Sequence, residues 1–245
     1  MELLVKCIFE LVGTMVMILL GDGVCASTSL SKSKSQGAGW VVITLAWGFA
    51  VMVGVLIAGP YSGAHLNPAV TLGLAIAGSF PWAEVAPYIC AQMIGGFLGG
   101  LLVYVFWRDH FKATEGDVLC IFCTMPAIDH KIQNFLCELI ATWVLVFVIL
   151  WIGASGNSFM IGGAAAQTGA IGAFPVTALI MAIGMSLGGA TGYALNPARD
   201  LSPRLVHQLI FKRDSGWAYS WVPVAGPLAG AALGAGCFLL ISILL

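Results

Sequence analysis

The sequence predicts an all-α integral membrane protein with six transmembrane helices and two shorter half-helices, arranged in two repeats of opposite orientation. Three observations support this fold class. The composition is too apolar for a water-soluble fold, the chain contains six apolar runs, and two unrelated motifs recur at nearly the same spacing.

Composition alone excludes most soluble functions. Of the 245 residues, 60% are apolar and 9% are charged, and the mean hydropathy is +0.98. Soluble domains carry about 25% charged residues. The ten Lys and Arg and eleven Asp and Glu residues cannot cover a soluble protein of this length, which excludes a globular enzyme and a disordered regulator. A formal net charge of −1 offers no basic surface for nucleic acid, so the expected surroundings are a lipid bilayer.

The apolar runs set the number of spans, because a spanning helix needs about 20 apolar residues. The runs that we assign to spanning helices are 3–20, 40–58, 83–106, 132–152, 174–187 and 219–245. Two shorter apolar stretches, 68–78 and 197–210, would reach only about half of the hydrocarbon core. Alternating strands of the β-barrel kind are not evident.

An internal repeat explains why the short stretches come in a pair. The Glu-Leu-x-x-Thr segment that begins at Glu10 returns at Glu138, an offset of 128, and the Asn-Pro-Ala that begins at Asn67 returns at Asn196, an offset of 129. The predicted organisation is a first repeat over 1–107 with its half-helix at 68–78, a connecting loop over 108–130, and a second repeat over 131–245 with its half-helix at 197–208. Each repeat has three spans, so the second must be inverted, and inverted repeats place their site near the midplane.

Charge does not assign an orientation by itself. If the N-terminus is cytoplasmic, most basic residues fall in or beside outside loops, which opposes the usual excess of Lys and Arg in cytoplasmic loops.

The repeated motif has a physical role at the start of each half-helix. The two copies are Asn67-Pro68-Ala69 and Asn196-Pro197-Ala198. Asn is a favoured N-cap and Pro a favoured first helical residue, so the positive ends of two helix dipoles would meet at the midplane and repel cations. Irregular backbone at membrane depth is tolerated where it lines a cavity. The carbonyls expected to line a pore are those of Gly63, Ala64, His65, Leu66, Gly192, Tyr193, Ala194 and Leu195. The alternative is an ordinary helix start, which two copies at the repeat offset make much less plausible.

These motifs resemble the two signature loops of the major intrinsic proteins, the aquaporins and glycerol facilitators. The matching segments are Ser-Gly-Ala-His-Leu-Asn-Pro-Ala-Val-Thr at 62–71 and Thr-Gly-Tyr-Ala-Leu-Asn-Pro-Ala-Arg-Asp at 191–200, and the resemblance covers essentially the whole chain. It implies the aquaporin fold, a homotetramer with one pore per subunit, and a selectivity filter of Trp47, Gly184, Tyr193 and Arg199. Water-selective members resemble one another in having His at the position of Gly184, so this chain is more similar to the glycerol branch.

Buried acidic residues leave two interpretations open. Glu10 and Glu138 are the only carboxylates that we expect well inside the spans, apart from Glu84 near one end. They could relay protons in a coupled carrier, or they could accept hydrogen bonds from the irregular loops. Their repetition favours the second role, structural support. Asp200, in the first turn of its half-helix, is also expected to be structural, through the helix dipole.

Glycines at four-residue spacing predict close helix contacts, at 96 and 100 and again at 226, 230 and 234. Sequence leaves open whether these faces pack within one subunit or between subunits.

The expected function is a passive channel in the plasma or inner membrane, crossing it several times. Its solutes would be glycerol and similar small uncharged molecules, with water, while ions and protons are excluded. The alternatives are a water-selective pore, a channel for dihydroxyacetone, urea or undissociated lactic acid, and a proton-coupled carrier. No nucleotide-binding or hydrolase motif suggests an enzyme or a cofactor. The lone Cys120-x-x-Cys123 pair does not predict a metal site.

Overall fold

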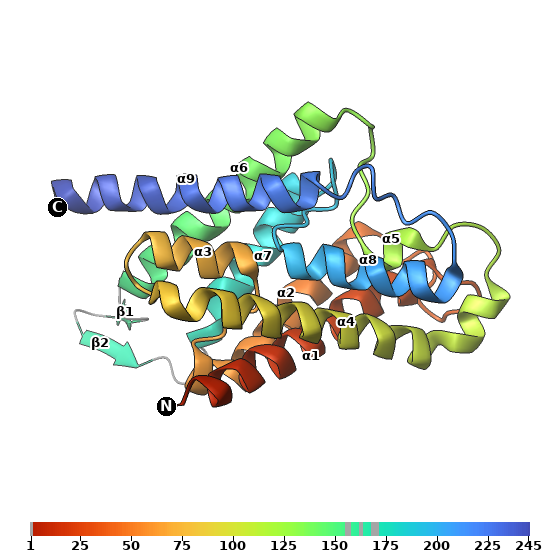
Figure 1. The fold of residues 1–245 in the computed structure, drawn as a ribbon, viewed down its shortest axis with the longest axis horizontal. Coiled ribbons are helices and arrows are strands. Elements are labelled where there is room, and N and C mark those ends of the chain that lie inside the picture. Colours follow the sequence, from red (N-terminus) through yellow and green to blue (C-terminus); the bar gives the residue numbers. More distant parts are fainter. Residues whose placement is uncertain (1, 155–157, 162–163, 168–171) are drawn as a thin grey trace.

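The protein is a bundle of long helices in a computed structural model that describes residues 2–154, 158–161, 164–167 and 172–245. The helices and strands are α1 (Leu3–Ser29), α2 (Trp40–Ser62), α3 (Pro68–Ile76), α4 (Trp82–Ala113), α5 (Leu119–Phe122), α6 (Lys131–Ala154), β1 (Ser158–Ile161), β2 (Ala164–Gln167), α7 (Phe174–Leu187), α8 (Pro197–Phe211) and α9 (Val222–Leu244). Both termini lie toward the same end of the bundle, as Figure 1 shows. An even number of spans requires this arrangement.

Among the described residues, five helices are long and apolar enough to cross a membrane: α1, α2, α4, α6 and α9. The sixth, α7, is an apolar helix of 14 residues. At 1.5 Å per residue it extends about 21 Å, less than the hydrocarbon thickness. The predicted fold class is confirmed, with these five long helices, the shorter apolar α7 and the two half-helices α3 and α8.

Two helices end well beyond the ranges that the sequence predicts. Helix α1 continues nine residues beyond 20, to Ser29, and α4 continues to Ala113, so the first part of the predicted loop at 108–130 is helical. Each predicted helix was ended at the first polar residues after its apolar run. In the structure the helix continues through these residues, because its last turns pack against other parts of the bundle. The short helix α5 and the antiparallel hairpin β1–β2 were not predicted.

Each half-helix packs against a long helix of the other repeat. Helix α3 packs on α9 of the second repeat, and α8 packs on α4 of the first. Figure 1 shows α3 and α8 extending away from each other from the middle of the bundle. A Cβ at Gly96 of α4 would lie 2.7 Å from the Ala198 carbonyl oxygen, so only glycine permits this approach. The packing therefore brings both Asn-Pro-Ala motifs to the centre.

The glycine faces are used within the subunit. On α9, a Cβ at Gly230 would lie 2.3 Å from the Leu139 carbonyl oxygen of α6, and one at Gly226 would lie 2.6 Å from Cβ of Glu138. These contacts settle the question that the sequence left open for the 226, 230 and 234 face.

Replacing Gly230 with alanine should lower the stability by about 1–3 kcal/mol, because the added methyl group must push backbone apart. Thermal unfolding of the detergent-solubilised protein measures this. Gly236→Ala on the same helix is the matched control, since a Cβ there meets nothing within 4 Å. An equal loss of stability in both variants would contradict the packing argument.

Candidate functional site

Two irregular loops with the same backbone pattern lead into the half-helices. Gly63, Ala64 and Leu66 have φ values of 84°, 51° and 53°. Their counterparts 129 residues later, Gly192, Tyr193 and Leu195, have φ values of 86°, 40° and 56°. Non-glycine residues in this left-handed region are strained, so the surrounding structure must hold the loops in place.

Glu10 of α1 holds the first loop. Its carboxylate is fully buried and accepts hydrogen bonds from the backbone N–H groups of His65 (2.9 Å) and Leu66 (2.7 Å). It also accepts from the Ser62 hydroxyl (2.6 Å) and from the Gln92 amide (2.8 Å). The loop donors, which have no helical or strand partner, are thereby satisfied.

Glu138 of α6 holds the second loop in the same way. It accepts hydrogen bonds from the N–H groups of Ala194 (2.9 Å) and Leu195 (3.1 Å) and from the Thr191 hydroxyl (2.6 Å). Both oxygens of each carboxylate thus act as acceptors toward a strained loop.

The two Asn side chains join the repeats at the centre. Each amide oxygen caps its own helix: Asn67 accepts from the Ala69 N–H, and Asn196 accepts from those of Ala198 and Arg199. Each amide nitrogen donates across the pseudo-twofold axis, from Asn67 to the Leu195 carbonyl and from Asn196 to the Leu66 carbonyl, both at 2.8 Å. The predicted lining carbonyls of Leu66 and Leu195 therefore also fasten the two half-helices together.

Two cavities meet at a constriction. One, of about 300 Å³, is lined by both loops and by apolar side chains such as Val51 and Ile180. The other, of about 210 Å³, is lined by residues that include Thr124. Trp47, Tyr193 and Arg199 line both cavities, so these three side chains surround the passage between them.

The constriction has an aromatic side and a cationic side. The Arg199 guanidinium carbon lies 4.4 Å from the ring centroid of Trp47, within cation–π range. Tyr193 packs edge-on against Trp40 at 5.7 Å between ring centroids. Gly184 lines neither cavity and lies behind Tyr193: a Cβ there would be 2.9 Å from the tyrosine Cζ. Because Gly184 has no side chain, the Tyr193 ring can occupy the space where one would otherwise lie.

Comparison with known proteins assigns the family. Residues 1–238 match the family model described as major intrinsic protein. The chain belongs to the major intrinsic protein family. Members of this family are channels, which confirms that the chain is not an enzyme and that it is a multi-pass membrane protein.

Relatives within the major intrinsic proteins cover nearly the whole chain. Glycerol uptake facilitator protein 3 of Lactiplantibacillus plantarum is 52% identical over 234 residues, covering 94% of this chain and 93% of the relative. The D/L-lactic acid transporter of the same organism is 36% identical over 239 residues, covering 94% of each. The X-ray structure of the aquaglyceroporin from Plasmodium falciparum superposes with a TM-score of 0.84 at 29% identity, covering 99% of this chain and 100% of that chain.

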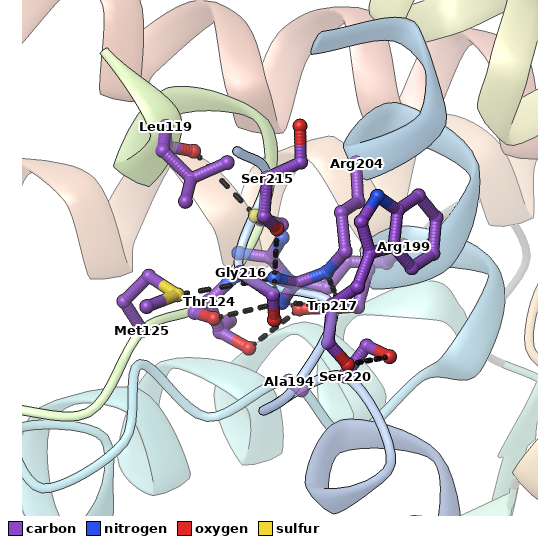
Figure 2. Close-up of polar contacts among 12 residues, drawn as sticks. Leu119, Thr124, Met125, Ala194, Arg199, Arg204, Ser215, Gly216, Trp217 and Ser220 are labelled. Atoms are coloured by element: carbon purple, nitrogen blue, oxygen red, sulfur yellow. Dashed lines mark hydrogen bonds and ion pairs between the residues drawn. The ribbon is translucent and has the colours of Figure 1, made fainter. Parts of the chain in front are cut away.

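Asp200 ties α8 to the central loop of this major intrinsic protein. Its carboxylate accepts from the Thr124 N–H (2.8 Å) and hydroxyl (2.6 Å) and from Arg204 Nε (2.9 Å). Arg204 in turn donates to the carbonyls of Thr124, Ser215 and Gly216, as Figure 2 shows. This buried network holds the loop that lines the smaller cavity.

Sequence reasoning missed Asp22. We expected only Glu10 and Glu138 well inside the spans, yet α1 carries Asp22 two residues past the predicted end of its apolar run, and its side chain is fully buried. The signal was present, since Asp22 lies between Gly21 and Gly23 directly after that run.

The cysteines show no metal arrangement. In the part of the chain that the structure describes, no group of three His, Cys, Asp or Glu side chains could hold a metal ion. In the central loop, burial raises the pKa of the Cys123 thiol, so this group stays protonated at neutral pH.

Proposed function

We propose that the chain is a passive channel for glycerol and similar small uncharged solutes, and that it also passes water. The observation that supports this most directly is the constriction, where two aromatic rings and a guanidinium surround the passage between two cavities. A small polyol has a carbon backbone on one side and hydroxyls on the other. Trp47 and Tyr193 would contact the carbons, while Arg199 would donate to the hydroxyls.

The rest of the proposed path is a row of acceptors and two central donors. The carbonyls of the two loops would replace water around a passing hydroxyl, and Asn67 and Asn196 would donate at the midpoint. Two helix N-termini and Arg199 together disfavour cations and protons. The names of the relatives, a glycerol uptake facilitator and an aquaglyceroporin, agree with this solute class.

The location of the protein follows from the family. The protein is a multi-pass protein of the plasma membrane. We propose a homotetramer with one pore in each subunit, in which exposed apolar side chains on the outer helices face lipid or neighbouring subunits.

Undissociated lactic acid is a second candidate solute, because the lactic acid transporter of L. plantarum is 36% identical to this chain. A proton-coupled carrier is disfavoured by the geometry of its two candidate residues. Glu10 and Glu138 both accept several hydrogen bonds from the loops, and neither lines a cavity among the described residues.

A stopped-flow swelling panel on proteoliposomes tests the proposal. Water, glycerol, urea and lactic acid are supplied separately, with lactic acid at two pH values. We expect glycerol flux well above that of empty liposomes, non-saturating and without accumulation under a pH gradient. Lactic acid flux, where present, should rise at the lower pH, because only the neutral form passes. Glycerol flux no faster than in empty liposomes would overturn the proposal.

A further inference from the structure

Asp22 is a buried carboxylate on the side of the constriction away from solvent. It is fully buried in α1, and both of its oxygens lack a hydrogen bond among the described residues. The nearest cation is Arg199, whose Nη1 lies 3.7 Å from Asp22 Oδ1. Burying an unpaired carboxylate is strongly unfavourable, and the ion pair with Arg199 compensates part of that cost.

Arg199 is equally dependent on this contact. Its Nη1 is buried and has no hydrogen bond, and in the described structure Asp22 is its only ion-pair partner within 4.0 Å. The nearby Asp200 carboxylate is already engaged by Arg204 and Thr124. A separation of 3.7 Å is too long for a hydrogen bond, so what Asp22 supplies is charge.

The same turn of α1 also supports the aromatic side of the constriction. A Cβ at Gly21 would lie 2.4 Å from the Trp47 ring, which therefore rests directly on the α1 backbone. Gly21 and Asp22 thus lie behind Trp47 and Arg199, away from the passage between the cavities.

We propose that Asp22 is a positioning residue and counter-ion for Arg199: it holds the guanidinium at the wall and cancels its charge, so that the constriction accepts hydroxyls without retaining small anions. Without the carboxylate, an unpaired cation would lie in a narrow site of low dielectric, where it attracts anions strongly. A small anion that binds there obstructs glycerol. This inference rests on the proposed glycerol conduction.

The experiment compares wild type, Asp22→Asn and the control Glu84→Gln in proteoliposomes. Glu84 pairs with Lys6 at 2.8 Å, lines neither cavity, and its replacement changes the net charge by the same amount. Glycerol swelling is measured in nitrate and in glucuronate at equal ionic strength and osmolarity, since the sugar ring of glucuronate is wider than nitrate or a linear polyol.

Wild type and Glu84→Gln should swell at the same rate in both salts. Asp22→Asn should swell at least about tenfold more slowly in nitrate than in the bulky anion, as one charge-assisted contact predicts. Asp22→Ser, which leaves room for a water beside the guanidinium, serves if the Asn variant does not fold. Equal rates in the two salts for both Asp22 variants would overturn the inference. Absence of glycerol flux in wild type would instead overturn the proposed function.

Discussion

Glycerol permeability is expected to fall about 10- to 100-fold when Gly184 is replaced by histidine. Glycerol could pass only by pushing the overpacked side chains aside, which would add about 1–3 kcal/mol to its barrier, and each 1.36 kcal/mol is tenfold in rate. The space beside Gly184 is filled by the Tyr193 ring and by Thr44 Cγ2, each 2.9 Å from where a Cβ would stand. An imidazole there must displace Tyr193 toward the passage, which narrows the slot on its aromatic side.

Water should still pass the Gly184→His variant, since a single water needs less width than a polyol. Stopped-flow swelling of the same proteoliposomes, with water and then glycerol as the permeant, measures both. Gly189→His is the matched control: it adds the same side chain where a Cβ meets nothing within 4 Å, and it lines neither cavity. Glycerol flux that stays at the wild-type level would show that Gly184 does not shape the constriction.

The sequence predicted the features that depend on local chemistry. Asn is a favoured N-cap and Pro a favoured first helical residue, and both Asn-Pro-Ala copies begin a helix in the structure. The backbone conformation repeats at the same offset as the motifs, since the residues with left-handed φ in the two loops are 129 positions apart. The helix starts could be read from the chain because neighbouring residues determine them, whereas the strained loop backbone depends on the distant carboxylates of Glu10 and Glu138.

Features that depend on packing between distant segments could not be predicted. The apolar run of α1 ends near residue 20, but Arg199, far along the chain, lies beside the next turn and provides a partner for Asp22. Likewise, nothing local indicates that the Leu66 and Leu195 carbonyls accept hydrogen bonds from the opposite Asn. Hydropathy reports how a segment meets lipid, whereas these contacts depend on which helix faces which.

The largest effect on stability is expected for Glu10→Ala, which should lower the free energy of unfolding by about 3–5 kcal/mol, because each buried donor left unpaired costs about 1–3 kcal/mol. The Ser62 hydroxyl and the Gln92 amide have second acceptors, the Ala58 carbonyl and the Thr71 hydroxyl. The N–H groups of His65 and Leu66 bond only to Glu10 in the described structure, so they carry most of the loss.

Thermal unfolding of the purified protein in detergent, followed by tryptophan fluorescence, measures the loss, with Glu84→Ala as the control. Glu84 is also a carboxylate on a spanning helix, but it is partly exposed and, among the described residues, accepts only from the Lys6 ammonium, so its removal leaves no described backbone donor unpaired. The stability loss of Glu10→Gln should fall between those of Glu10→Ala and Glu84→Ala. The Gln amide oxygen still accepts a hydrogen bond, but the amide nitrogen is a donor that faces other donors. A Glu10→Ala protein as stable as wild type that had lost only a pH-dependent flux would instead assign Glu10 to proton transfer. Four donors converging on one carboxylate favour the structural role, since a proton added there would break the contacts that hold the loop.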